Sequence, residues 1–341
     1  DYSGGASCPS LLLEPSRTNL VDQSELFNVD TSWILSGRPA VQTNVIVSPE
    51  GAQNGSRLTY GGGNVLRYSP ELTFTNGYSY SIFVKKDVGR YVTIYAAFFT
   101  TSVAIGFDLD EGTCQAGGVI EPYGDEWYRI SVSNSVAGDA DKSGYFYLYS
   151  TSVLGATSST SGNKLYVYGA QIEDGSYPTS YIPTYGVSQT RATESYANNS
   201  ATNLIGQTEG VLFIDFVPNT DTLSTKWLAF LGGGSNYIGI YIPSSSNNIR
   251  LEVADTTNQA TFNVPYVAGQ RYKCAIAYAN NDVTAYANGV QLGSDTNASI
   301  PATSTIRSYY NLSNIESTDT NQLLLFKTRL TNAELAALTT I

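Results

Sequence analysis

Tyrosine is the residue type whose spacing in this sequence could support a chemical function. There are 26 tyrosines among 341 residues, and many recur at every second position with aliphatic residues between them. Because side chains alternate between the two faces of a strand, this spacing predicts an aliphatic face toward a core and a tyrosine face on the outside. An outward phenol ring can stack on a sugar ring and hydrogen-bond to its alcohols. The candidate glycan-binding residues are Tyr91, Tyr95, Tyr145, Tyr147, Tyr149, Tyr166, Tyr168, Tyr237 and Tyr241.

Two other interpretations of the tyrosine spacing remain open. Loops could cover the tyrosine face, with the phenol oxygens hydrogen-bonded to the backbone, or the face could be a contact between subunits. The tryptophans Trp33, Trp127 and Trp227 lie beside apolar runs, so we expect them in the core rather than in contact with a ligand.

One segment has the spacing of a calcium loop. Asp139, Asp141 and Ser143 match the start of a loop that binds calcium through oxygen ligands. The twelfth position is Ser150, so the bidentate glutamate of such loops is missing. The segment is either a solvated turn or a calcium site, and no cofactor is required by any other motif.

Paired carboxylates could in principle hydrolyse glycosidic bonds. The candidates are Asp108 with Asp110, Glu111, Asp125 with Glu126, and Glu173 with Asp174, but no strand carries the E-x-D-x-x-E pattern of concanavalin-like glycosidases. The sequence contains no histidine, which excludes His-based triads and zinc–histidine sites. We therefore expect a protein that is not an enzyme, with a polysaccharide depolymerase, either hydrolase or lyase, as the alternative.

Short strands must position these residues. Alternation of period two recurs between Gly, Asn, Asp and Pro residues, which is typical of antiparallel sandwiches. A helical pattern is clear only at the end, where Thr331 can cap, Glu334 follows three residues later, and Leu335 and Leu338 form an apolar face. We expect one short helical turn at a sheet edge. The expected strands are residues 78–85, 91–96, 127–132, 145–149, 165–170, 211–217, 237–242 and 274–279.

The composition predicts two domains. Residues 184–207 lack alternation and are rich in Thr, Ser, Asn and Gly, which is typical of a connector. We therefore expect an all-β protein with two tandem antiparallel β-sandwiches at residues 1–186 and 209–341, joined by a linker at 187–208. The halves do not align with each other, so we expect two different sandwiches.

Charge and hydropathy limit the partners. The net charge of −11 argues against binding to nucleic-acid backbones, and no apolar run reaches the 18 or so residues of a membrane span. The hydrophobic content of 42% argues against disorder. The three cysteines, Cys8, Cys114 and Cys274, match no metal spacing, and we expect them to be unpaired.

Three segments of the first half resemble tail-fibre and related structural proteins of tailed bacteriophages. Residues 11–20 (LLLEPSRTNL) are similar to the segment that opens those modules. Residues 107–112 (FDLDEG) and 120–129 (IEPYGDEWYR) resemble a central hairpin, and residues 168–183 with 190–192 resemble the closing segment. The resemblance implies a jelly roll of the carbohydrate-binding-module type.

The second half resembles laminin-G and concanavalin A-like sandwiches. Residues 269–278 (GQRYKCAIAY) and 282–289 (DVTAYANG) are similar to a strand pair of that family, and residues 323–335 to its C-terminal segment. Tyr272 stands where that family usually has Trp, and Asn288 where it often has Asp. The second difference weakens any metal-binding role at this turn.

Together the resemblances imply a non-catalytic virion protein, located on the phage particle or outside the cell. The expected function is recognition of a bacterial surface polysaccharide by a tail fibre, receptor-binding or adhesion module. The expected partners are that glycan and other virion proteins, without nucleic acid or membrane insertion. A homotrimer is an open alternative, although no heptad or β-helix repeat predicts one. A purely structural head-fibre or decoration protein is the alternative function.

Overall fold

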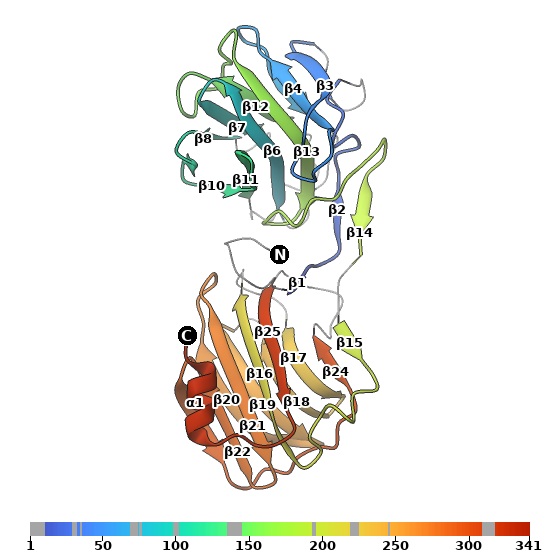
Figure 1. Cartoon of the computed structure of the whole chain (residues 1–341), viewed down its shortest axis with the longest axis vertical. Coiled ribbons are helices and arrows are strands. Elements are labelled where there is room, and N and C mark those ends of the chain that lie inside the picture. Colours follow the sequence, from blue (N-terminus) through green and yellow to red (C-terminus); the bar gives the residue numbers. More distant parts are fainter. Residues whose placement is uncertain are drawn as a thin grey trace. The chain divides into compact units, whose positions relative to one another are not determined.

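The computed structural model describes residues 11–28, 33–34, 36–68, 74, 77–97, 102–134, 145–192, 196–218, 225–244, 246–308 and 318–341. The chain forms two compact units (Figure 1). One unit is Arg17–Arg191, and the other combines Asp1–Ser16 with Ala192–Ile341. Each expected strand lies within a strand of the structure, which confirms the all-β class.

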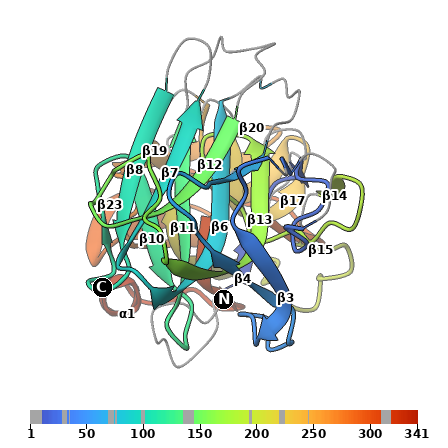
Figure 2. The ribbon, with the colours of Figure 1, turned by 90° about the horizontal axis from the view of Figure 1, so that it is seen from above.

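The first unit is a sandwich of two antiparallel sheets. One sheet has the order β10-β11-β6-β13-β4-β3 and the other β5-β12-β7-β8-β9. Figure 2 shows β8, β7 and β12 of the second sheet side by side. The strands of the first sheet are β3 (Ala40–Ile46), β4 (Gly55–Thr59), β6 (Tyr78–Val88), β10 (Gly118–Pro122), β11 (Trp127–Asn134) and β13 (Lys164–Asp174). Those of the second are β5 (Leu66–Tyr68), β7 (Tyr91–Ala97), β8 (Ser102–Asp108), β9 (Thr113–Cys114) and β12 (Tyr145–Thr151).

Alternation within the strands builds the core of the first unit. Phe146 and Leu148 of β12 and Ile94 of β7 are buried in one apolar cluster with Ile82 and Val84 of the facing sheet. Burial of each such side chain contributes about 1.5–3 kcal/mol. The residues between them on β12 and β7 therefore lie on the outer face of the sheet, and apart from the buried Thr93 they are tyrosines.

The second unit is also a sandwich of two antiparallel sheets. Their orders are β1-β25-β16-β21-β22-β23 and β15-β24-β17-β18-β19-β20. The strands of the first are β1 (Leu11–Leu13), β16 (Glu209–Pro218), β21 (Tyr272–Ala279), β22 (Asp282–Ala287), β23 (Val290–Asp295) and β25 (Thr318–Phe326). Those of the second are β15 (Tyr196–Asn198), β17 (Lys226–Gly233), β18 (Asn236–Ile242), β19 (Asn248–Asp255), β20 (Thr257–Pro265) and β24 (Ile306–Ser308).

The helix α1 (Asn332–Thr339) begins at the expected cap. The backbone N–H of Thr331 donates to Glu334 at 2.8 Å, and the N–H of Glu334 donates to the Thr331 hydroxyl at 3.3 Å. The helix packs on the face of β21 and β22 rather than at a sheet edge (Figure 1), because Leu335 is buried among side chains of that face. Among the described residues, no helix is long and apolar enough to cross a membrane.

The division into units differs from the expected one in two places, at the first strand and in the expected linker. Strand β1 pairs with β25, so residues 11–13 add a strand to the second sandwich. Within the expected linker, β14 (Gln189–Arg191) pairs with β2 (Arg17–Asn19), β15 pairs with β24, and Ala201 and Ile205 are buried in the second core. Strand pairing uses backbone groups, so a polar composition did not prevent these residues from joining the sheets.

Candidate functional site

The outer face of the sheet β5-β12-β7-β8-β9 brings tyrosines from two strands together. Tyr147 of β12 lies opposite Tyr95 of β7, and Arg67 of β5 lies opposite Tyr147 on its other side. Tyr145 and Tyr149 project from the same face of β12, two residues before and after Tyr147. We call Arg67, Tyr95, Tyr145, Tyr147 and Tyr149 the tyrosine platform.

The rings of the platform form a continuous group with Tyr147 at its centre. The centroid of Tyr147 is 5.8 Å from that of Tyr145 and 5.9 Å from that of Tyr149, and the Tyr147 and Tyr149 planes differ by only 14°. The Tyr95 centroid is 5.6 Å from that of Tyr147. These separations are typical of favourable aromatic pairs, so the rings fix one another in place.

The platform is accessible from outside the sandwich. Tyr145 is 37% exposed, and Tyr95, Tyr147 and Tyr149 are half-buried. Burial raises the pKa of Tyr149, the neighbouring Tyr147 and Tyr95 add to the rise, and the positive charge of Arg67 opposes it. The Tyr149 phenol therefore stays neutral near pH 7 and keeps its hydroxyl as a hydrogen-bond donor.

The segment after β12 borders the platform on the side of β8. Gly106 of β8 has no side chain on this face, and a Cβ there would lie 2.3 Å from the backbone nitrogen of Gly155. The Leu154 side chain also approaches this position, at 2.8 Å. The close approach requires glycine at residue 106, and it places Leu154 and Gly155 over the outer face of β8.

Tyr91 lies on the same face as the platform but at the far end of β7. It is half-buried, and the Arg90 guanidinium carbon lies 5.2 Å from its ring centroid. Arg90 itself is paired with Asp108. Tyr91 is therefore part of a separate contact with this ion pair rather than of the ring group around Tyr147.

Tyr168 was expected on an exposed face, but the structure shows that it is buried. Its ring is only 1% exposed and packs with Phe83, Trp127 and Tyr181, and its hydroxyl lies 3.3 Å from Oε1 of Glu25. Segments outside the sheet cover this part of β13, which local alternation cannot show. Its neighbour Tyr166 on the same face is half-buried and lies beside Arg57.

Tyr241 in the second unit is also buried, at 6% exposure. Its ring centroid lies 4.1 Å from that of Trp227, and its hydroxyl donates to Glu252 at 2.5 Å. Tyr237, half-buried, donates to the same carboxylate at 2.8 Å. Trp227 is half-buried on the outer face instead of lying in the core as expected. The hydroxyls of Tyr237 and Tyr241 are both hydrogen-bonded to Glu252. The expected exposure of Tyr241 was wrong.

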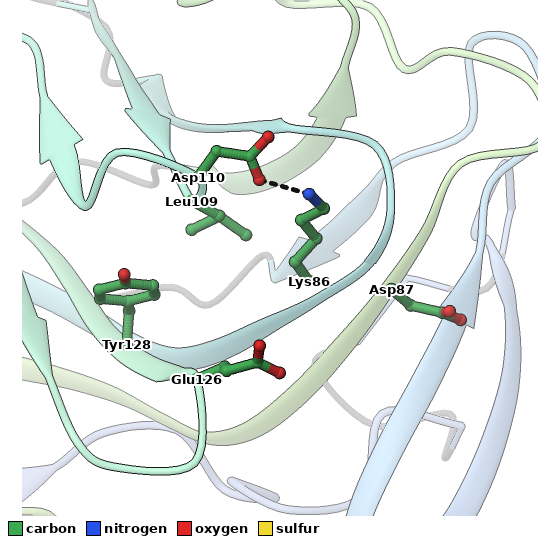
Figure 3. A pocket seen from close by; sticks show the side chains of 6 residues that line it. All are labelled: Lys86, Asp87, Leu109, Asp110, Glu126 and Tyr128. Atoms are coloured by element: carbon green, nitrogen blue, oxygen red, sulfur yellow. Dashed lines mark hydrogen bonds and ion pairs between the residues drawn. The ribbon is translucent and has the colours of Figure 1, made fainter.

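A polar pocket lies at one end of the first sandwich, and of its residues only Asp110 and Glu126 were considered from the sequence, as candidate carboxylates. It has a volume of about 360 Å³ and is lined by Lys86, Asp87, Leu109, Asp110, Glu126 and Tyr128 (Figure 3). Lys86 pairs with Asp110 across it, whereas the Asp87 carboxylate pairs with Arg57. Its residues come from β6, the turn after β8 and the start of β11, so no local spacing could have revealed it.

Two of the carboxylates considered for catalysis, Asp108 and Glu173, stabilise the fold. Asp108 accepts a double hydrogen bond from Arg90, at 2.9 Å from Nε and 2.6 Å from Nη2. These bonds, with backbone donors at residues 110 and 111, lower the pKa of Asp108, which makes it a poor proton donor. Glu173 is fully buried and accepts from the Thr179 N–H and the Gln171 amide, each at 2.8 Å.

We expect Asp108 to make the first sandwich sensitive to acid. Its lowered pKa in the folded state contributes stability above the unfolded value of about 3.9, and this stability is lost as pH falls through the folded pKa. Asp108→Asn should lower the free energy of unfolding by about 1–2 kcal/mol at pH 7, a modest loss because Arg90 is 41% exposed. The variant lacks the Asp108 carboxylate, so it cannot lose this contribution again when the pH falls. Urea unfolding of both proteins at pH 7 and pH 3 measures this.

The control is Asp110→Asn, which breaks the more exposed pair with Lys86 and should change stability by no more than about 0.5 kcal/mol. If the free energies of unfolding of the wild type and Asp108→Asn differ equally at both pH values, Asp108 is not the source of the acid sensitivity.

The site residues Asp139, Asp141 and Ser143 lie outside the described residues. Within the described residues, no group of three or more Cys, Asp or Glu side chains could hold a metal ion. Cys114 and Cys274 are free thiols, as expected.

Comparisons with known proteins give only weak similarities. No family model matches the chain, and no curated protein matches it. The carbohydrate-binding module CBM40 of the Ruminococcus gnavus IT-sialidase is 15% identical, over 41% of this chain and 88% of that one, with a TM-score of 0.35. A heptameric SAP-like pentraxin from Limulus polyphemus is 15% identical, over 39% and 70%, with a TM-score of 0.32. The receptor-binding domain of botulinum neurotoxin mosaic serotype C/D is 12% identical, over 43% and 41%, with a TM-score of 0.34. Similarities of this size identify no family for the chain.

Proposed function

We propose that this protein binds glycans through the tyrosine platform and does not catalyse a reaction on them. The observation that carries the proposal is the group of accessible rings around Tyr147 on the outer face of the sheet. Each ring offers an apolar face for the C–H side of a sugar and a hydroxyl for its alcohols. The strands beneath it are fixed by the core, so the rings need little ordering when a ligand binds.

The site fits binding better than hydrolysis. Two carboxylates that could serve as acid or nucleophile, Asp108 and Glu173, are engaged in hydrogen bonds that stabilise the fold. Neither lies among the rings around Tyr147. A depolymerase would need two carboxyl groups facing one sugar-binding surface at a defined separation.

We further propose that the glycan belongs to a bacterial surface and that the protein is a tail-fibre or adhesion component of a virion, outside the cell. The resemblance of residues 11–20, 107–129 and 168–192 to tail-fibre modules of tailed phages supports this. Contacts with other virion proteins follow from the same resemblance and remain a prediction, and a homotrimer remains an open alternative. The calcium site at Asp139 also remains a prediction.

A binding experiment with the whole chain tests the proposal. The wild-type protein should bind members of an array of bacterial capsular and envelope polysaccharides, and the double variant Tyr95→Ala/Tyr147→Ala should lose detectable binding because it removes the centre of the ring group. Tyr123→Ala is the matched control: this tyrosine is 48% exposed but lies on the other sheet, against Phe83. Equal binding by the double variant and wild type would count against the platform, and release of reducing ends or unsaturated products would count against a non-catalytic function.

A further inference from the structure

We propose that the platform selects an acidic sugar and that Arg67 holds its negatively charged group. The inference rests on the proposed function, because it names the class of glycan bound at the same site. It follows from the position of Arg67, from its contacts, and from its contrast with Arg57 and Arg90 of the same sandwich.

Arg67 lies directly against the rings. Its guanidinium carbon is 5.3 Å from the ring centroid of Tyr145 and 5.9 Å from that of Tyr147. Cation–π contact of this kind fixes the plane of the guanidinium without using its hydrogen-bond donors. The donors therefore remain for a ligand that lies on the rings.

The charge of Arg67 is not neutralised by the protein. Among the described residues, no carboxylate forms an ion pair with Arg67, its side chain makes no hydrogen bond, and its buried Nε lacks an acceptor. A buried charged donor without an acceptor is costly, and a ligand that lies on the rings could supply the acceptor.

Other arginines of the same sandwich show the contrast. Arg57 pairs with Asp87 at 2.6 Å and Arg90 pairs with Asp108 at 2.6 Å. The chain has 29 acidic against 18 basic residues, so carboxylate partners are abundant. Unlike Arg57 and Arg90, Arg67 has no carboxylate partner among the described residues, and it lies at the surface proposed to bind sugar.

The chemistry of a guanidinium indicates the ligand. Its planar fork matches the two oxygens of a carboxylate or phosphate, and the adjacent rings accommodate the pyranose that carries them. A uronic acid, a sugar with another carboxylate, or a phosphate-substituted sugar would satisfy both parts of the site. A neutral sugar would use the rings alone.

Matched polysaccharide pairs test the inference. The probes are uronic-acid capsular polysaccharides, each compared with its carboxyl-reduced neutral form, and a glycerol-phosphate teichoic acid compared with a neutral glycan. The whole wild-type chain should bind one acidic class about 10-fold more tightly than its neutral counterpart, with affinity that falls as salt rises. Arg67→Gln should weaken binding of the acidic form by about 10-fold, so that the preference disappears, and should weaken binding of the neutral form by less.

Two further variants control the experiment. Lys164→Gln removes one positive charge from the other sheet of the same sandwich, on the face that carries Tyr166, and should keep the preference. Arg67→Lys keeps the charge but loses the planar fork, so it should retain only part of the preference, and it serves if Arg67→Gln does not fold, as judged by its melting curve. Equal affinity of the wild type for acidic and neutral forms, or an unchanged preference in Arg67→Gln, would overturn the inference while leaving glycan binding intact. A wild type that binds no glycan of either kind would overturn both proposals.

Discussion

Tyr147→Ala is expected to weaken glycan binding by about 30-fold, which corresponds to about 2 kcal/mol. The reason is its central position: the Tyr147 ring contacts Tyr145, Tyr149 and Tyr95 and lies beside Arg67. Its loss removes one stacking surface and also the support that holds its neighbours in their orientation. Titration calorimetry with the best-binding polysaccharide from the array measures the affinity.

Tyr147→Phe separates the ring from the hydroxyl. It keeps the stacking surface, so binding should fall by no more than about 10-fold, the range of one hydrogen bond. Tyr147→Phe keeps the ring and should change the free energy of unfolding by no more than about 1 kcal/mol, whereas Tyr147→Ala loses the contacts with three tyrosine rings and should lower it by about 1–2 kcal/mol. If the phenylalanine variant binds as weakly as the alanine variant, the hydroxyl and not the stacked ring is the main contact.

The platform could be predicted from the sequence because its basis is local. In residues 145–149 the tyrosines and the aliphatic side chains occupy alternate positions, and alternation alone assigns them to opposite faces. The pairing of Tyr147 with Tyr95 and of Arg67 with Tyr147 could not be predicted, since strand register depends on partners 50 to 80 residues away. Arg67 was missed for that reason.

The burial of Tyr168 and Tyr241 could not be predicted from the sequence. Tyr168 follows the same alternation as Tyr147, but Glu25 and Tyr181 lie over it, and both are distant in sequence. Tyr241 is covered in a similar way by Trp227 of the neighbouring strand. Whether the outer face of a sheet is open or covered is decided by tertiary contacts, and period-two alternation carries no information about them.

The helix cap could be predicted from the sequence and the domain boundary could not, because the cap depends on neighbouring residues and the boundary on distant ones. The cap at Thr331 was predictable because Thr331 and Glu334 are three residues apart and bond to each other's backbone. The pairing of Leu11–Leu13 with Thr318–Phe326 joins segments about 300 residues apart, and no local pattern in either segment indicates the other. A boundary predicted from composition therefore assigned β1 to the wrong sandwich.

Leu335→Ala is expected to destabilise the second sandwich by about 2–5 kcal/mol, the range for removal of a fully buried leucine. Leu335 is fully buried, and its cluster contains Val211, Phe213, Ala275 and Tyr286 on the outer face of the sheet β1-β25-β16-β21-β22-β23. Without it, α1 loses its main apolar contact, and a helix of eight residues is too short to be stable alone.

The matched control for this variant is Leu338→Ala, since Leu338 is only half-buried against the same cluster and should cost less than half as much. Thermal and urea unfolding of the whole chain measure both variants, with two transitions if the units unfold separately. Binding of glycan at the platform should be unchanged at temperatures where the variant is folded, because the platform belongs to the other unit. If Leu335→Ala lowers stability no more than Leu338→Ala does, α1 is an appendage of the sandwich rather than part of its packing, and the face beneath it must be stable when exposed to water.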